Sequence, residues 1–286
     1  MTEPASSFKS IILVTIFAVC VSLFAYNTEV GKDFIDKVPD SFFLAIYIKQ
    51  TAEMDTKDFT PIEVLRDITL TELKDNTTFK AGIIWKSNPA LILVVRRPGC
   101  QLCREESMRI SSLRELISEK MGLNMVAIVH ENLNNEVEDF NQGFWKGTVY
   151  FDKEKAFFSA IGGGKIQYAG LTNILKPSVW SNIRRNYNSG VGGNFKGDGS
   201  VLGGLYIIKS DTKGEEVIYQ YREKVWGDHA PLEEVLKACE LVSPKNGEAS
   251  IQSDIKAALE KVKSETLLSN KDEGPSKTCN SQESCG

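Results

Sequence analysis

Two absences narrow the function of this chain. His130 and His229 are its only histidines in 286 residues. A structural zinc site takes four cysteine or histidine ligands, and the single Cys-x-x-Cys pair has no second pair to complete such a set, so we predict neither a metal nor another cofactor. A basic face is also missing, because 34 lysines and arginines are balanced by 38 acidic residues. The composition therefore excludes nucleic acid as an expected partner.

The sequence also has no apolar run of the roughly 20 residues that a membrane-spanning helix needs. The apolar stretch at residues 11–25 is shorter than that, and Lys9 precedes it. We predict that residues 11–26 form an uncleaved anchor that contacts a membrane. A cleaved signal peptide is one alternative, although no small-x-small cleavage site follows, and a buried helix is another. The predicted location is the cytoplasm, with a membrane tether; the secretory route is the alternative.

The six cysteines do not form the pattern of a disulfide framework. Cys20 lies in the N-terminal apolar stretch, and Cys239 lies on the apolar face of a predicted helix. Cys279 and Cys285 lie in a polar tail, where nothing in the sequence fixes their geometry. This distribution is typical of a protein from a reducing compartment.

The order of apolar segments predicts the fold. Residues 90–95 and 123–129 are apolar runs typical of buried strands, and an amphipathic helix is predicted between them. This is a right-handed βαβ unit with parallel strands. A third strand at 148–151, a β-hairpin within 201–221 and a helix at 231–242 complete a thioredoxin-like α/β/α sandwich with a mixed sheet. The predicted segments are an anchor or signal-like region at 1–27, a linker with accessory helices at 28–77, the globular domain at 78–243, and a C-terminal helix with a disordered tail at 244–286.

The motif that carries chemistry is the pair Cys100 and Cys103, which directly follows the strand at 90–95. The pair begins the predicted helix. Unpaired N–H groups and the positive end of the helix dipole favour a thiolate at such a position. The second cysteine lies one turn along, within reach of the first. The motif therefore predicts a redox-active pair in which Cys100 attacks and Cys103 resolves.

Three arginines flank the pair and are predicted to stabilise a thiolate: Arg96, Arg97 and Arg104. Successive residues of an extended strand point to opposite sides, so Arg96 and Arg97 cannot both face the same thiol. Arg104 lies in the first helical turn, where pairing with Glu105 or Glu106 explains it equally well.

The stretch 96–106, RRPGCQLCREE, resembles the signature of the peroxiredoxin-like 2 family, and of its 2A branch in particular. Residues 144–152, 197–206 and 221–228 agree in order, so the resemblance covers roughly residues 78–242 together with the short apolar N-terminus. It implies a thioredoxin-like fold, a redox-active pair at Cys100 and Cys103, and an antioxidant role in redox regulation.

The chain departs from true peroxiredoxins in its site residues. Leu93 and Arg97 stand where the Pro-x-x-x-Thr-x-x-Cys motif has proline and threonine. The active-site arginine that peroxiredoxins carry on a later strand falls at Gly203. Arg97 thus replaces the hydroxyl that orients a peroxide, and we expect it to be the main thiolate-stabilising residue. With the groups that bind peroxide altered, we expect modest turnover.

We therefore predict an antioxidant thiol oxidoreductase that acts on a peroxide or another small molecule. Its cysteine pair cycles between dithiol and disulfide. Thioredoxin or another dithiol reductant recycles the pair. Two alternatives stay open. In one, the protein reduces an apolar endoperoxide as a prostaglandin F synthase does, which is the activity of a sister branch of the family. In the other, it is a membrane-tethered regulatory module whose cysteines sense redox state without turnover.

Overall fold

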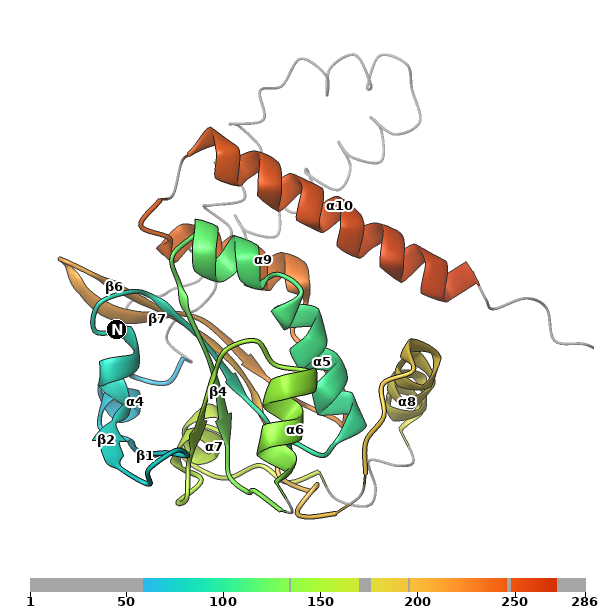
Figure 1. Ribbon diagram of the computed structural model, residues 1–286, viewed down its shortest axis with the longest axis horizontal. Helices are drawn as coiled ribbons and strands as arrows, with labels where there is room; N and C mark the ends of the chain where they lie inside the picture. Colours follow the sequence, from blue (N-terminus) through green and yellow to red (C-terminus); the bar gives the residue numbers. More distant parts are fainter. Residues whose placement is uncertain (1–58, 134, 170–175, 195, 246–247, 272–286) are drawn as a thin grey trace, which may run out of the picture. The chain divides into compact units, whose positions relative to one another are not determined.

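The described part of the chain is built around a seven-stranded mixed sheet. The computed structural model describes residues 59–271 except 134, 170–175, 195, 246 and 247 (Figure 1). The strand order is β2-β1-β5-β4-β3-β6-β7, in which β3, β4 and β5 are parallel and the other pairs are antiparallel. The strands are β1 (Thr69–Glu72), β2 (Thr78–Lys80), β3 (Ala90–Val94), β4 (Asn124–Val129), β5 (Thr148–Phe151), β6 (Gly204–Asp211) and β7 (Gly214–Arg222).

Helices cover both faces of this sheet. They are α4 (Ile62–Arg66), the 3₁₀ helix η2 (Ala81–Trp85), α5 (Gln101–Ser111), the π-helical turn η3 (Glu115–Lys120), α6 (Glu136–Gly143), α7 (Ala156–Ile161), α8 (Pro177–Ser189), α9 (Leu232–Val242) and α10 (Ala249–Lys271). Helices α5, α6 and α9 pack on one face, whereas α4 and α7 pack on the other (Figure 1). The predicted thioredoxin-like α/β/α sandwich with a mixed sheet is confirmed.

Strand β3 explains why the sheet is buried on both sides. All five of its residues are buried. Leu91 and Leu93 belong to the apolar core under α5 and α9. Ala90, Ile92 and Val94 belong to the core under α4 and α7. Because side chains of a strand alternate between faces, one continuous apolar run supplies both layers. The strand is thereby fixed firmly below the turn that carries the cysteines.

The sheet begins before residue 78, where the sequence led us to place the start of the globular domain. Strand β1 pairs with both β2 and β5, so part of the segment predicted as a linker belongs to the sheet. Only Leu70 of its four residues is buried, which is too weak a pattern to predict a strand. Helix α7 was also not predicted; the buried Asp152 begins it by accepting the backbone N–H groups of Ala156 and Phe157 at 2.9 and 2.7 Å.

The C-terminal amphipathic helix expected after Pro244 is α10. Its residues Ile251 and Ile255 are buried in the core shared with α9, and Lys120 forms an ion pair with Asp254 at 2.9 Å. None of the helices in the described part of the chain combines the length and apolar character needed to cross a bilayer. The predicted anchor at 11–26 and the tail after residue 271 lie outside the described residues.

Candidate active site at Cys100 and Cys103

The two cysteines lie where the chain leaves β3 and enters α5. Cys100 has an extended backbone, with φ −75° and ψ 124°, and occupies the N-cap position of α5. Cys103 follows in the first turn, where the Arg104 N–H donates to the Cys100 carbonyl at 2.9 Å. Both are free thiols, and they are 8% and 7% exposed. The predicted placement of the pair at a helix N-terminus is what the structure shows.

The surroundings make the two sulfurs unequal. A hydrogen bond from the Cys103 thiol, the charge of Arg96 and the backbone N–H groups of Cys103 and Leu102 hold the pKa of Cys100 well below its usual range, although burial opposes them. The same hydrogen bond, burial and the charge of Cys100 raise the pKa of Cys103 well above its usual range. This arrangement favours a thiolate on Cys100 beside a protonated Cys103.

Arg96 is the charged residue that contacts both sulfurs. Its Nη2 atom lies 3.2 Å from Cys100 Sγ and 3.7 Å from Cys103 Sγ. The residue is only 3% exposed. Its Nη1 atom donates to the Gly199 carbonyl at 3.3 Å, and the Trp226 ring centroid lies 6.0 Å from the guanidinium carbon. A charge buried at a site of low dielectric constant interacts strongly with a neighbouring thiolate.

Glu223 is the counterion of Arg96, with Oε1 of Glu223 3.9 Å from Nη2 of Arg96. The carboxylate also accepts the N–H groups of Gly203 at 3.0 Å and Gly227 at 3.2 Å. Burial raises its pKa, and the Arg96 charge opposes that effect. The backbone around Gly203 has no space for the arginine that peroxiredoxins carry there, since a Cβ atom would lie 2.1 Å from the Val94 carbonyl oxygen. The cation at the sulfurs comes from Arg96 instead.

Arg97 points to a different place, whereas the resemblance led us to expect it at the thiolate. Its guanidinium donates to the backbone carbonyl of Asn194 and, at 3.3 Å, to the side-chain carbonyl of the same residue. Asn194 in turn donates its backbone N–H to the Gly99 carbonyl at 2.8 Å. No hydrogen bond joins Arg97 to either sulfur in the part of the chain that the structure describes. Arg97 therefore holds the Asn194 loop against the turn that precedes Cys100.

Arg104 also stabilises the turn before Cys100 by contacting its backbone. Its Nε atom donates to the Pro98 carbonyl at 2.8 Å, and its guanidinium carbon lies 4.6 Å from the ring centroid of Phe144. Neither predicted partner, Glu105 or Glu106, binds it; Glu105 instead pairs with Arg185 at 2.8 Å. The structure thus brings one of the three predicted arginines to the sulfurs and assigns backbone contacts to the other two.

A polar network behind the cysteine helix was missed by sequence reasoning. His229 lies 3.0 Å from the Leu102 carbonyl through Nε2 and 3.1 Å from Arg185 through Nδ1. Because Arg185 can only donate, Nδ1 accepts and Nε2 carries the proton. Burial and the charges of Arg185 and Arg109 hold the pKa of His229 well below its usual range. A neutral His229 therefore anchors the first turn of α5, and no spacing along the chain signalled this contact.

Glu106 is a second acidic group near the site. It accepts the Ala230 N–H at 3.2 Å. Burial, with help from the charge of Glu223, raises the pKa of Glu106 to about 8. The segment at 221–228, which contains Glu223 and Trp226 and resembles the family, was the one signal from this region, and it did not predict a role for either residue.

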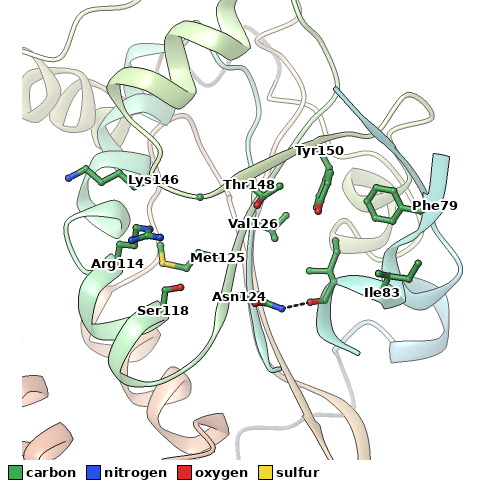
Figure 2. Close-up of a pocket in the computed structure, with 12 residues that line it drawn as sticks. Phe79, Ile83, Arg114, Ser118, Asn124, Met125, Val126, Lys146, Thr148 and Tyr150 are labelled. Atoms are coloured by element: carbon green, nitrogen blue, oxygen red, sulfur yellow. Dashed lines mark hydrogen bonds between the residues drawn. The ribbon is translucent and has the colours of Figure 1, made fainter. Parts of the chain in front are cut away.

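Two of the cavities in the described part of the chain lie away from the cysteines. One of about 750 Å³ is lined by residues in and next to β2, η2, η3, β4 and β5 (Figure 2). A smaller one of about 390 Å³ lies beside Gly203 and Glu223. Neither is lined by Cys100 or Cys103. Among the described residues, no group of three His, Cys, Asp or Glu side chains is placed to hold a metal ion.

Comparison with known proteins gives the family. Residues 109–225 match the model of the AhpC/TSA antioxidant enzyme family, so the match starts after both cysteines. Among solved structures, Xanthomonas campestris peroxiredoxin Q aligns with 63% of this chain and 93% of its own, at 15% identity and a TM-score of 0.41. The peroxiredoxin-like 2A proteins of Bos taurus and Homo sapiens are each 38% identical to this chain, over 192 and 185 residues, which is 67% and 64% of this chain and 84% and 77% of the relatives. The chain belongs to the peroxiredoxin-like 2A family.

Proposed function

We propose that this protein is a thiol-dependent oxidoreductase that reduces a peroxide, with Cys100 as nucleophile, Cys103 as resolving residue and Arg96 as the stabilising cation. The observation that carries the proposal is the position of the Arg96 Nη2 atom, 3.2 Å from one sulfur and 3.7 Å from the other at the start of α5. A guanidinium there stabilises a thiolate and also a negative charge that develops on a leaving oxygen. The match of residues 109–225 to the model of an antioxidant enzyme family supports the same reaction.

The first step transfers oxygen to the thiolate. The Cys100 sulfur attacks the terminal oxygen of the peroxide, the S–O bond forms, and the O–O bond breaks. The departing alkoxide takes a proton and leaves as an alcohol, while Cys100 becomes a sulfenic acid. Arg96 donates its N–H groups toward the charge that moves from sulfur to oxygen.

The second step forms the disulfide. Cys103 gives up its proton, its sulfur attacks the Cys100 sulfur, and the S–O bond breaks with loss of water. A dithiol such as thioredoxin then reduces the disulfide with two electrons and becomes a disulfide itself. The net reaction converts a peroxide and a dithiol into an alcohol, water and a disulfide. A reducing compartment such as the cytoplasm, which is our proposed location, maintains such a dithiol pool.

The test is peroxide-dependent turnover coupled to thioredoxin and its reductase. We expect Cys100→Ser to abolish turnover. Cys103→Ser should still consume one equivalent of peroxide, as a sulfenic acid at Cys100 seen by mass spectrometry, but should not complete the cycle. Cys279→Ser is the matched cysteine control and should keep full turnover. Unchanged turnover in Cys100→Ser would refute the proposal.

No observation favours the two alternatives over this reaction. Reduction of a prostaglandin endoperoxide calls for a deep apolar groove beside Cys100, and neither described cavity borders that residue. A regulatory module that senses redox state without turnover would be expected to have a Cys100 pKa near the usual thiol value. In this structure the hydrogen bond from Cys103 and the charge of Arg96 lower the pKa of Cys100.

A further inference from the structure

The larger cavity lies at the edge of the sheet opposite the cysteines. Strands β3, β4 and β5 are parallel, and Cys100 follows the carboxyl end of β3, whereas Asn124 and Thr148, which line the cavity, begin β4 and β5. The six residues of β4 separate the two edges by about 17 Å at the usual rise per residue. The thiol chemistry therefore does not account for this cavity.

The cavity lies beside an incomplete strand pairing. Strand β5 pairs with β4 along all four of its residues, from Thr148 to Phe151. Strand β1 pairs only with Tyr150 and Phe151. Within the described chain, the edge of β5 at Thr148 and Val149 has no strand beside it on the β1 side, and Thr148 is exposed. An open edge of this kind is normally covered, and here a cavity of about 750 Å³ lies beside it.

The walls of the cavity are held in place by contacts of their own. The Asn124 side chain donates to the Ile84 carbonyl at 2.7 Å, which fixes η2 against β4. The Trp145 Nε1 atom donates to the Thr148 carbonyl at 3.2 Å. Gly147 lies so close to β4 that a Cβ atom would be 2.6 Å from the Met125 carbonyl oxygen. The cavity is thus preformed, as ligand sites in proteins usually are.

The two walls differ in chemistry (Figure 2). On one side, Ile83 and Phe79 present apolar surface; Ile83 is 62% exposed, and the Phe79 ring packs edge-on against Tyr150 at 4.7 Å. On the other side lie the cations Arg114 and Lys146. Between the two walls lie the start of β5 and its Thr148 side chain.

The charges at the cavity are of one sign. Asp and Glu are absent from the residues that line it. Arg114 donates to Glu119, outside the lining, at 2.6 Å and is still 43% exposed. Lys146 forms no ion pair among the residues that the structure describes. An anionic head group is therefore the complement of the Lys146 side, and an apolar chain is the complement of the Ile83 side.

We propose that this cavity binds an amphipathic carboxylate of the fatty-acid class, with its head group at Lys146 and Arg114 and its chain against Ile83 and Phe79. The site is separate from the cysteine pair and does not depend on the peroxide reaction proposed above. The volume of about 750 Å³ is within the range found for small-molecule sites.

Isothermal titration calorimetry of the full chain with decanoate, below its micelle concentration, tests the proposal. We expect one molecule to bind per chain. Lys146→Gln and Ile83→Ser should each weaken binding about tenfold. Lys146→Gln removes the positive charge that faces the head group, and Ile83→Ser removes the exposed apolar surface that contacts the chain. Both side chains are exposed, so neither change removes core packing.

Matched controls separate this site from general adsorption. Lys153→Gln removes an exposed lysine and Val64→Ser an exposed β-branched residue, both outside the lining, and each should change the affinity less than about twofold. Decyltrimethylammonium, which has the same chain and a positive head group, should bind at least about tenfold more weakly. No binding of decanoate, equal binding of the two amphiphiles, or the same affinity in Lys146→Gln and Lys153→Gln would each overturn the proposal.

Discussion

The guanidinium of Arg96 and the carboxylate of Glu223 form a nearly buried ion pair, 3.9 Å apart, whose side chains are only 4% and 10% exposed. Arg96 reaches the two sulfurs from one side of this pair, while the backbone N–H groups of Gly203 and Gly227 hold Glu223 from the other. The cation at the thiols is therefore fixed by a residue more than a hundred positions away in the sequence.

Exchanging one arginine at a time separates the roles of Arg96 and Arg97. Arg96→Gln removes the cation at the sulfurs and should raise the pKa of Cys100, because the Arg96 charge lowers it in the native protein. The Arg96→Gln variant should therefore react more slowly with hydrogen peroxide near neutral pH. Stopped-flow measurement of sulfenic acid formation at Cys100 gives this rate. Arg97→Gln removes a charge of the same kind one residue later. In the native protein the Arg97 side chain contacts Asn194 and not the sulfurs. We expect that variant to keep a Cys100 pKa near that of the native protein; equal shifts in both variants would contradict the assignment.

Neutralising Glu223 should destabilise the fold. Glu223→Gln leaves Arg96 buried without its counterion, and a Gln side chain has one oxygen where the carboxylate has two to accept the Gly203 and Gly227 N–H groups. We expect the free energy of unfolding to fall by about 2–4 kcal/mol in urea denaturation. Glu216→Gln on the exposed surface of the same hairpin should change it by less than about 0.5 kcal/mol. If the free energy of unfolding of Glu223→Gln equals that of the native protein, the ion pair does not contribute to stability.

Glu106 should make stability depend on pH. Burial and the Glu223 charge raise its pKa to about 8, so the folded state binds more protons than the unfolded state between about pH 4.5 and 8. The contribution of Glu106 to stability is therefore greatest below this window and is lost as pH rises through it. We expect Glu106→Gln, measured by urea denaturation at both ends of the window, to reduce this loss by about 1–2 kcal/mol, less than full burial would give because the side chain keeps some solvent contact. An identical pH profile in both proteins would argue against a raised pKa.

Two adjacent glycines offer a matched test of the loop beside the cysteine turn. A Cβ atom at Gly193 would lie 2.5 Å from the Gln101 backbone nitrogen, whereas one at Gly192 would meet nothing within 4 Å. Gly193→Ala should push the loop away from the turn and cost about 1–3 kcal/mol of stability. Gly192→Ala should cost less than about 0.5 kcal/mol. Denaturation curves that coincide for the two variants would show that this contact is loose.

Much of the fold could be predicted because its central strands are continuous apolar runs in the sequence. Residues 90–95 and 123–129 are long enough to identify central strands, and residues 148–151 are strand β5 itself. Strand β1 was missed because only Leu70 of its residues is buried. Helix α7 is short and begins at the Asp152 carboxylate rather than at a recognisable helical pattern.

The candidate site was predicted less completely. The Cys-x-x-Cys spacing and its position after a strand identified the pair, since both are local features. Strand alternation showed that Arg96 and Arg97 diverge, but which one faces the sulfurs depends on Glu223 and Asn194. These partners come from distant parts of the chain, and so does His229, which anchors the helix of the cysteines. Contacts of that kind follow from the assembled sheet and have no local signature.

The central claim is that the surroundings of Cys100 lower its pKa and so favour its thiolate. Ultraviolet titration of the thiolate absorbance in the reduced protein, with Cys100→Ser subtracted, measures its pKa directly. We expect a Cys100 pKa well below the ordinary thiol value, because the Cys103 hydrogen bond and Arg96 stabilise the anion. A Cys100 pKa near the ordinary thiol value of about 8.5 would contradict the account and favour a protein that senses redox state without turnover.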